Sequence, residues 1–257
     1  MQFKDYFSKQ ASQYREFRPH YPPELFAYLA GLTKHHDLAW DCATGNGQAA
    51  LGLAPYYAQV IATDASRAQL EQATQDPKIR YKLLPAEQTD IASSSVDLVT
   101  VAQALHWFDF DRFFAEVRRV ARPDAVIAIW GYSLMKFGVP ALDGLVAHFY
   151  DDVLWKGGYW PEQRRYLDEE YDTIPFPFAA LTPPVITLRV KWNFERFLQY
   201  LGTWSAVQKF RDSKGFDPVA HHLREALFQA WGEPSEPREL STDLLMRVGR
   251  VNASRSE

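Results

Sequence analysis

Residues 39–50 read AWDCATGNGQAA, and this stretch decides the fold. Apolar residues lead to the acidic Asp41, and a run of small residues with two glycines, Gly45 and Gly47, then opens a helix-forming stretch. This order predicts a strand, a tight turn and a helix N-terminus, the place where Rossmann-like folds bring backbone N–H groups close to a ligand. Such a loop holds a dinucleotide or another nucleoside cofactor.

Composition indicates a single globular α/β domain. A chain of 257 residues can bury a sizeable core, and its hydrophobic fraction of 47% is ordinary for a globular protein. The net charge of −4 lacks the basic surplus of nucleic-acid-binding domains. We therefore expect no nucleic-acid partner.

The sequence gives no sign of export or of membrane insertion. Residues 1–10, MQFKDYFSKQ, lack the apolar core of a signal peptide. The uncharged run 173–188 contains prolines and is too short to span a bilayer. Cys42 is the single cysteine, which excludes an internal disulfide and a cysteine-based metal cluster. We expect a cytoplasmic protein without a membrane partner.

Strand-like and helical patterns alternate through the first half of the chain. Runs such as VIATD, VDLVTV and AVIAIW are almost continuously apolar, as strands buried on both faces of a parallel sheet are. The expected strands are Leu38–Cys42, Gln59–Asp64, Ile79–Leu84, Val96–Val101 and Ala125–Trp130, and the expected helices are residues 21–32, Gln48–Tyr57, Ser66–Thr74 and Asp109–Ala121. Two later strands, Val185–Trp192 and Ser241–Val251, would complete a Rossmann-like, seven-stranded, mostly parallel sheet flanked by helices.

The alternation lapses at about residues 136–181, where aromatics and prolines surround the helical pattern PEQRRYLDEEY. We interpret this segment as an inserted cap over the ligand site. The single domain, 1–257, then consists of an N-terminal lid and helix (about 1–35), a cofactor-binding half (about 36–133), the substrate cap, and closing strands and helices (about 185–257).

The loop matches the G-x-G-x-x-A form of the dinucleotide fingerprint, but two features favour another nucleoside. Asp64 ends the second predicted strand, where an acidic side chain accepts hydrogen bonds from ribose hydroxyls; its alternative role is to cap the next helix. Nearly forty residues precede the glycine loop, whereas a dehydrogenase fingerprint often opens its domain. Asp41, at the strand end, suits an ammonium group and would repel a pyrophosphate. A ribose and an ammonium group without phosphate indicate S-adenosylmethionine.

Four segments resemble consecutive motifs of class I S-adenosylmethionine-dependent methyltransferases, and they are WDCATGNGQAA, VIATDAS, LLPAEQTDIASSSVDLVTVAQALHWFD and AVIAIWGY. The pieces HWFD and IWGY, with FSKQASQYREFRPHYP upstream, resemble the trans-aconitate methyltransferase-like branch. The similarity continues more loosely through GYWPEQRRYLDEEYDTIPFP and YLGTWSAVQKF, so it covers nearly the whole chain. Each motif is moderately specific, whereas their order and spacing together are strong.

The resemblance implies roles for the residues around the glycine loop. Asp41, Gly45 and Gly47 match the loop that contacts the methionine part of the cofactor. Asp64 matches the acidic ribose ligand, and Ala65 lies beside the adenine.

Further matches follow along the chain. Ala86 and Glu87 match the segment that flanks the adenine, and Gln103 matches the loop that lies under the sulfonium. Tyr14 and Arg18 match an N-terminal segment that folds over the cofactor, where Arg18 would pair with the cofactor carboxylate.

Two positions depart from the family pattern. Ala43 replaces the first loop glycine of many relatives, and Pro85 replaces an acidic residue that precedes the Ala-Glu pair. The second departure leaves open how the adenine amino group is recognised.

The acceptor decides which chemistry the site needs. A carboxylate is already ionised at neutral pH and needs no base, whereas a phenol, an amine or a carbon acid must lose a proton. His106 is the one histidine expected to face the site. It serves as a base for a phenol, as a neutral donor to a carboxylate, or as a hydrogen-bonded core residue. No histidine or carboxylate cluster has metal-ligand spacing, so no metal is expected.

The predicted cap carries two arginines, Arg164 and Arg165, among aromatic residues. An arginine pair binds carboxylates bidentately, but acidic residues on the same helix would compete for it. The aromatics that either wall a substrate pocket or belong to the core are Trp107, Trp130, Tyr132, Trp160 and Trp204.

The sequence thus predicts a methyltransferase that acts on a small molecule, with O-methylation of a carboxylic acid as the first hypothesis. The alternatives are a phenolic or apolar acceptor with His106 as base, a non-catalytic cofactor-binding regulatory protein, and a nicotinamide oxidoreductase. Whether the protein is a monomer or a dimer is left open by the sequence.

Overall fold

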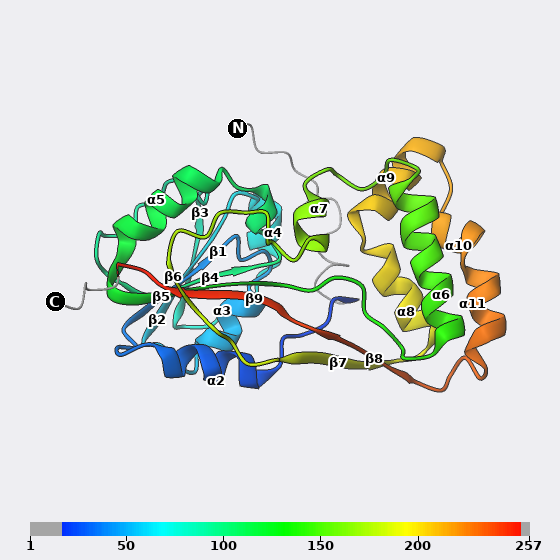
Figure 1. Ribbon diagram of the computed structural model, residues 1–257, viewed down its shortest axis with the longest axis horizontal. Helices are drawn as coiled ribbons and strands as arrows, with labels where there is room; N and C mark the ends of the chain where they lie inside the picture. Colours follow the sequence, from blue (N-terminus) through cyan, green and yellow to red (C-terminus); the bar gives the residue numbers. More distant parts are fainter. Residues whose placement is uncertain (1–16, 253–257) are drawn as a thin grey trace.

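The computed structural model describes residues 17–252, and its centre is a seven-stranded sheet (Figure 1). The strand order is β3-β2-β1-β4-β5-β9-β6, with β1 to β5 parallel and β9 antiparallel to both of its neighbours. The strands are β1 (Leu38–Cys42), β2 (Gln59–Asp64), β3 (Ile79–Leu83), β4 (Val96–Ala102), β5 (Ala121–Gly131), β6 (Ala179–Leu181) and β9 (Leu245–Arg250). The predicted Rossmann-like, mostly parallel sheet is confirmed.

The sheet divides the core in two because successive side chains of a strand point to opposite faces. Leu98 of β4 packs on one face, with α2 (Pro23–Leu32) and α3 (Gln48–Leu53). Val99 packs on the other face, with α5 (Phe110–Val120). The short helix α4 (Arg67–Glu71) follows β2, and the 3-10 turn η2 (Leu105–Trp107) follows β4. Burial on both faces explains the continuous apolar runs in the sequence.

A helical lobe lies beyond one end of the sheet (Figure 1). It contains α6 (Pro140–His148), the π-helix η3 (Phe149–Trp155), α8 (Phe194–Gly202), α9 (Ser205–Lys214), α10 (Pro218–His222) and α11 (Arg224–Trp231). The lobe therefore draws on two separate stretches of chain, one inside and one after the predicted cap. The remaining helix, α7 (Arg164–Asp168), lies between the lobe and the sheet (Figure 1). The predicted division of the chain into four functional parts stays a prediction.

Two strand expectations are wrong. The expected strand Ser241–Val251 is divided at Leu244, so that its first residues belong to β8 (Arg238–Asp243) and its later residues to β9. Residues 187–192 form β7 (Thr187–Trp192), which pairs with β8 in a separate two-stranded sheet, and β6 takes the seventh place in the main sheet. Pro183 and Pro184 separate β6 from β7, because proline has no N–H group to donate to a neighbouring strand. The ribbon β7–β8 reaches toward the helical lobe (Figure 1). No helix among residues 17–252 combines the length and apolarity needed to cross a bilayer.

Candidate functional site

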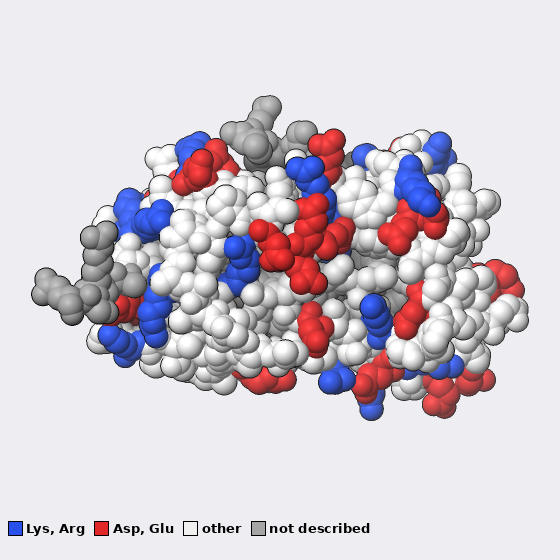
Figure 2. Space-filling model, viewed as in Figure 1, with Lys and Arg blue, Asp and Glu red and all other residues white. Residues whose placement is uncertain are grey.

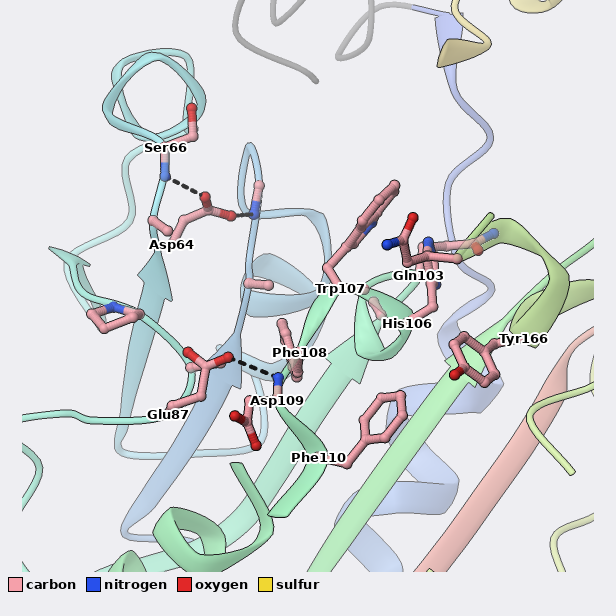
Figure 3. Close-up of a pocket in the computed structure, with 18 of the residues that line it drawn as sticks. Asp64, Ser66, Glu87, Gln103, His106, Trp107, Phe108, Asp109, Phe110 and Tyr166 are labelled. Carbon is pink, nitrogen blue, oxygen red and sulfur yellow. Dashed lines mark hydrogen bonds between the residues drawn. The ribbon is translucent and has the colours of Figure 1, made fainter. Parts of the chain in front are cut away.

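A cavity of about 920 Å³ opens at the carboxyl ends of the parallel strands, where ligands bind in open α/β sheets (Figure 3). Its wall is formed by the turn after β1, the end of β2, the loops after β3 and β4, and α7. The predicted site residues that line it are Gly45, Asp64, Ala65, Ala86, Glu87, Gln103, His106, Trp107 and Arg165. Segments far apart in the sequence thus meet at one cavity.

Asp64 fixes the shape of the glycine loop. Its carboxylate accepts hydrogen bonds from the backbone N–H groups of Gly45 (2.8 Å) and Ser66 (2.7 Å), as Figure 3 shows. The helix cap of α4 is a different group, because the Ser66 hydroxyl accepts the Gln69 N–H. Ser66, and not Asp64, therefore caps the helix, and Asp64 lines the cavity.

The glycine turn needs left-handed backbone at three positions, with φ of +53° at Ala43, +57° at Gly45 and +88° at Gly47. Ala43 adopts this conformation although it carries a side chain, so the alanine that departs from the family pattern does not prevent the turn from forming. Gly47 lies behind the cavity wall, where a Cβ atom would overlap the Tyr81 hydroxyl. Close packing of β3 against the turn therefore requires glycine there.

Asp41 is fully buried and does not line the cavity. Its carboxylate accepts hydrogen bonds from the hydroxyls of Thr44 (2.5 Å) and Thr100 (2.8 Å). Burial raises the pKa of Asp41 to about 6, against the lowering effect of these bonds. The predicted contact between Asp41 and the cofactor ammonium stays a prediction.

Gln103 and Glu87 are held by backbone contacts. Gln103 has a φ of +57°, and its side-chain amide donates to the Tyr132 carbonyl (3.0 Å), which joins the ends of β4 and β5. Glu87 accepts a hydrogen bond from the Asp109 N–H (3.0 Å, Figure 3). Both side chains are thereby fixed in the cavity wall before a ligand binds.

The described residues that line the cavity include five carboxylates but one guanidinium, that of Arg165. The carboxylates belong to Asp64, Glu87, Asp109, Asp111 and Glu162. Figure 2 shows acidic side chains gathered at the centre of one face, between the sheet and the helical lobe. Such a wall suits a cationic ligand such as a sulfonium and disfavours a pyrophosphate.

His106 belongs to the cavity wall and is 6% exposed. Its Nδ1 atom lies 3.3 Å from the hydroxyl of Tyr171. Burial and, to a smaller extent, the nearby positive charge of Arg164 together lower the pKa of His106 to about 3. The imidazole is therefore neutral at physiological pH.

A second, smaller hollow of about 10 Å³ lies at the end of β5, against the helical lobe. It contains the guanidinium groups of Arg18 and Arg164, together with the aromatics Tyr132, Tyr150, Trp160, Tyr200 and Trp204. Arg164 lies over the Trp160 ring at 4.9 Å and pairs with Asp168 (3.3 Å). An acidic residue of the same helix, Asp168, therefore competes with any substrate carboxylate for Arg164.

The two neighbouring arginines of α7 point in different directions. Arg164 enters the small hollow, whereas Arg165 lines the large cavity and lies 5.2 Å from the Tyr166 ring. Arg18 is in the small hollow and does not line the cofactor cavity, so its predicted contact with the cofactor carboxylate stays a prediction.

Two predicted residues fall elsewhere. Trp130 lines neither space; it is fully buried in the core, with the Tyr21 ring edge-on at 5.5 Å. Tyr14 lies outside the described residues. Within residues 17–252 no group of three or more His, Cys, Asp or Glu side chains is placed to hold a metal ion.

Sequence reasoning missed three buried tyrosines. Tyr150 and Tyr200 line the small hollow, and Tyr171 contacts His106. Tyr171 and Tyr200 fall within the segments of looser family similarity, but their spacing along the chain gives no sign that they approach the site. Two of the five carboxylates of the cavity wall, those of Asp109 and Asp111, were visible in the sequence as DFD, next to the HWF segment.

Comparisons with known proteins agree with this geometry. A family model described as a methyltransferase domain matches residues 40–129, which carry most of the cavity wall. A protein described as an S-adenosylmethionine-dependent methyltransferase of Saccharomyces cerevisiae is 32% identical over 140 residues, covering 50% of this chain and 47% of the yeast protein.

Two relatives match over most of their length. A crystallised protein of Anaeromyxobacter dehalogenans, described as a type II methyltransferase, is 42% identical with a TM-score of 0.85, covering 93% of this chain and 100% of its own. A methyltransferase of Dictyostelium discoideum is 34% identical, covering 89% of this chain and 87% of its own. With such similarity over nearly the whole length, this chain belongs to the class I S-adenosylmethionine-dependent methyltransferases, and its cofactor is S-adenosylmethionine.

Proposed function

We propose that this enzyme O-methylates a small carboxylic acid, the activity that its resemblance to the trans-aconitate methyltransferase-like branch implies. The observation that carries the proposal is the small hollow at the end of β5, where Arg18 and Arg164 face three tyrosines. Two guanidinium groups thus meet in this hollow, and Arg164 also pairs with the carboxylate of Asp168. A carboxylate is the common small-molecule group that such a site attracts.

The chemistry of a carboxylate acceptor matches the titratable groups of the cavity. When bound, the cofactor supplies an activated sulfonium methyl group; an oxygen lone pair of the acceptor forms the new O–C bond, the C–S electrons stay on sulfur, and no proton moves. The protein then has to align the acceptor and exclude water. The hollow itself has room for about one water molecule, so Arg18 and Arg164 would attract the acid by their charge. Gln103 and His106 would border the carboxylate group of the acceptor in the cofactor cavity.

The phenol-type alternative needs a base, and His106 is a poor one. A pKa of about 3 leaves the ring with little affinity for a proton taken from a phenol, whose own pKa is about 10. Burial therefore supports the role of His106 as a neutral hydrogen-bonding group. We infer that the acceptor is a small molecule, and cytoplasmic localisation stays part of this proposal.

The test is a kinetic comparison of arginine variants on a panel of mono-, di- and tricarboxylic acids, with methyl esters detected by mass spectrometry. Arg164→Gln should raise KM for the acid about 10- to 100-fold, since hydrogen bonds to a charged group contribute about 1.5–3 kcal/mol. Its affinity for S-adenosylhomocysteine, measured by calorimetry, should stay unchanged. Arg18→Gln should behave in the same way if Arg18 binds the acceptor.

Arg224→Gln is the matched control. Arg224 also lies over an aromatic ring, that of Phe194, and pairs with a carboxylate, but it lies in neither binding space. Its KM should match that of the wild type. Weaker cofactor binding in Arg18→Gln with unchanged KM would assign Arg18 to the cofactor carboxylate instead. Turnover of phenols but of no acid in the panel would overturn the proposal.

A further inference from the structure

Tyr171 is buried beside the cavity and reaches His106 with its hydroxyl. The side chain is 0% exposed, and its Oη atom lies 3.3 Å from His106 Nδ1. The two rings are nearly parallel, with an angle of 23° between their planes. Among residues 17–252, His106 Nδ1 is the one hydrogen-bond partner of this hydroxyl.

The surrounding structure holds Tyr171 in place at a cost in backbone strain. Glu170 and Tyr171 are successive non-glycine residues in the left-handed region, with φ of +56° and +62°. Arg247 of β9 donates to the Tyr171 carbonyl (2.6 Å) and to that of Ile174 (2.5 Å), which fastens this turn to the sheet. Strained backbone that is fastened in this way often belongs to a functional site.

Gly131, the last residue of β5, leaves room for the tyrosine. A Cβ atom there would overlap Leu167 and approach the Tyr171 hydroxyl to 3.2 Å. The end of β5 is therefore shaped to let this hydroxyl reach His106.

The direction of the hydrogen bond follows from the partners available. Burial raises the pKa of the Tyr171 phenol, so the O–H group stays protonated. A buried O–H with a single acceptor donates to it, because an unmade buried hydrogen bond is costly. Nδ1 is then the acceptor, and the proton of the neutral ring lies on Nε2.

We propose that Tyr171 is a positioning residue that holds His106 in its Nε2–H tautomer, so that the ring donates a hydrogen bond to the acceptor. No hydrogen bond joins Nε2 to a described residue, and His106 lines the cofactor cavity, so this N–H is the donor left for a ligand there. On a carboxylate acceptor it binds the oxygen that does not attack and keeps the other oxygen toward the methyl group. This last step rests on the proposed function, whereas the tautomer does not.

The tautomer can be measured without any acceptor. In protein labelled with ¹⁵N-histidine, long-range ¹H–¹⁵N spectra separate the protonated ring nitrogen from the unprotonated one, and the His106→Gln spectrum assigns the His106 signals. The wild type should show Nε2–H alone. Tyr171→Phe keeps the ring but removes the hydroxyl, and it should show a mixture of tautomers or Nδ1–H.

Kinetics provide the second readout. Tyr171→Phe should lower kcat about tenfold, with unchanged affinity for S-adenosylhomocysteine. His106→Gln keeps an N–H near the position of Nε2 and should retain part of the activity. Adding Tyr171→Phe to His106→Gln should have no further effect, because the histidine on which Tyr171 acts is gone; a merely structural tyrosine would lower kcat in both backgrounds.

Tyr57→Phe is the matched control, since it also removes a buried hydroxyl, one that pairs with Thr33 away from both binding spaces (2.9 Å). It should change neither the tautomer nor kcat. A wild-type His106 protonated on Nδ1, or a Tyr171→Phe variant with the wild-type tautomer and kcat, would overturn the proposal. If the wild type had its proton on Nε2 but methylated no acid, the proposed tautomer would be confirmed, and only the carboxylate acceptor would be contradicted.

Discussion

The carboxylates of Asp64 and Asp97 each accept hydrogen bonds from two backbone N–H groups. Asp64 lies at the carboxyl ends of the parallel strands, and Asp97 lies at their amino ends. Asp97 near the start of β4 accepts from Asp37 and Leu38 (2.9 Å each), whereas Asp64 at the end of β2 accepts within the cavity wall. Asp64→Asn should weaken S-adenosylhomocysteine binding by about 1–3 kcal/mol, because the amide has one acceptor oxygen where the carboxylate has two, and its NH2 group cannot accept from the loop or from the ribose. Asp97→Asn should lower stability without changing that affinity. Calorimetry and urea unfolding compare the two, and equal affinities would contradict the ribose assignment.

Asp41 makes stability depend on pH in an unusual direction. The folded protein keeps a proton on this carboxyl up to a pKa of about 6, whereas the unfolded chain releases it near 3.8. Between these values the folded state binds more protons, so the stability that this group contributes is fully present below pH 3.8 and falls as pH rises to 6. Asp41→Asn should remove this dependence and raise the free energy of unfolding above pH 6 by up to about 3 kcal/mol. Urea unfolding from pH 4 to 7.5 measures it; a parallel dependence in both proteins would contradict it.

At the scale of elements, the β1–α3 turn is the least tolerant part of the site. Gly47→Ala should strain the backbone at φ +88° and displace the Tyr81 hydroxyl, so we expect a loss of at least about 2 kcal/mol in stability and at least tenfold in cofactor affinity. Tyr81→Ala in the same chain should restore part of the loss, since it removes the overlap but not the strain.

Gly158→Ala separates strain from overlap in these measurements. Its φ is +73°, but nothing lies within 4 Å of a Cβ atom there. It should cost about 1–2 kcal/mol of stability and leave cofactor affinity unchanged. If Gly47→Ala cost no more than Gly158→Ala, the close packing of Tyr81 would be unimportant.

At the scale of the whole molecule, the cofactor should stabilise the sheet and α7 together. The cavity wall combines loops after four strands with α7, so a bound ligand contacts all of them. S-adenosylhomocysteine at 100 times its Kd should add about 2.7 kcal/mol, which corresponds to a Tm rise of about 5–10 °C. NADH should give no rise, because its pyrophosphate meets an acidic wall. Equal shifts from the two ligands would contradict the assignment of the cavity to a sulfonium cofactor.

Local pattern determined the five parallel strands and the glycine turn, and the family resemblance added most of the residues of the cofactor cavity. Burial on both faces produces the continuous apolar runs of β1, β2, β4 and β5, and the parallel arrangement brings their carboxyl ends to one edge, so residues at those ends had to meet. Asp64 was therefore found from its position at a strand end, whereas the family resemblance indicated Gln103, and His106 was placed at the site by its position three residues after Gln103.

Tertiary structure decided what depends on contacts between distant segments. Arg18 and Arg164 line one hollow although 146 positions separate them in the sequence. Tyr171 contacts His106, which lies 65 positions earlier. Likewise, β7 has the pattern of a strand, but which sheet it joins depends on its pairing with β8, about fifty residues away. Periodicity shows which face of an element is buried; it does not show which partner buries that face, because the partner is chosen by packing energy summed over the whole molecule.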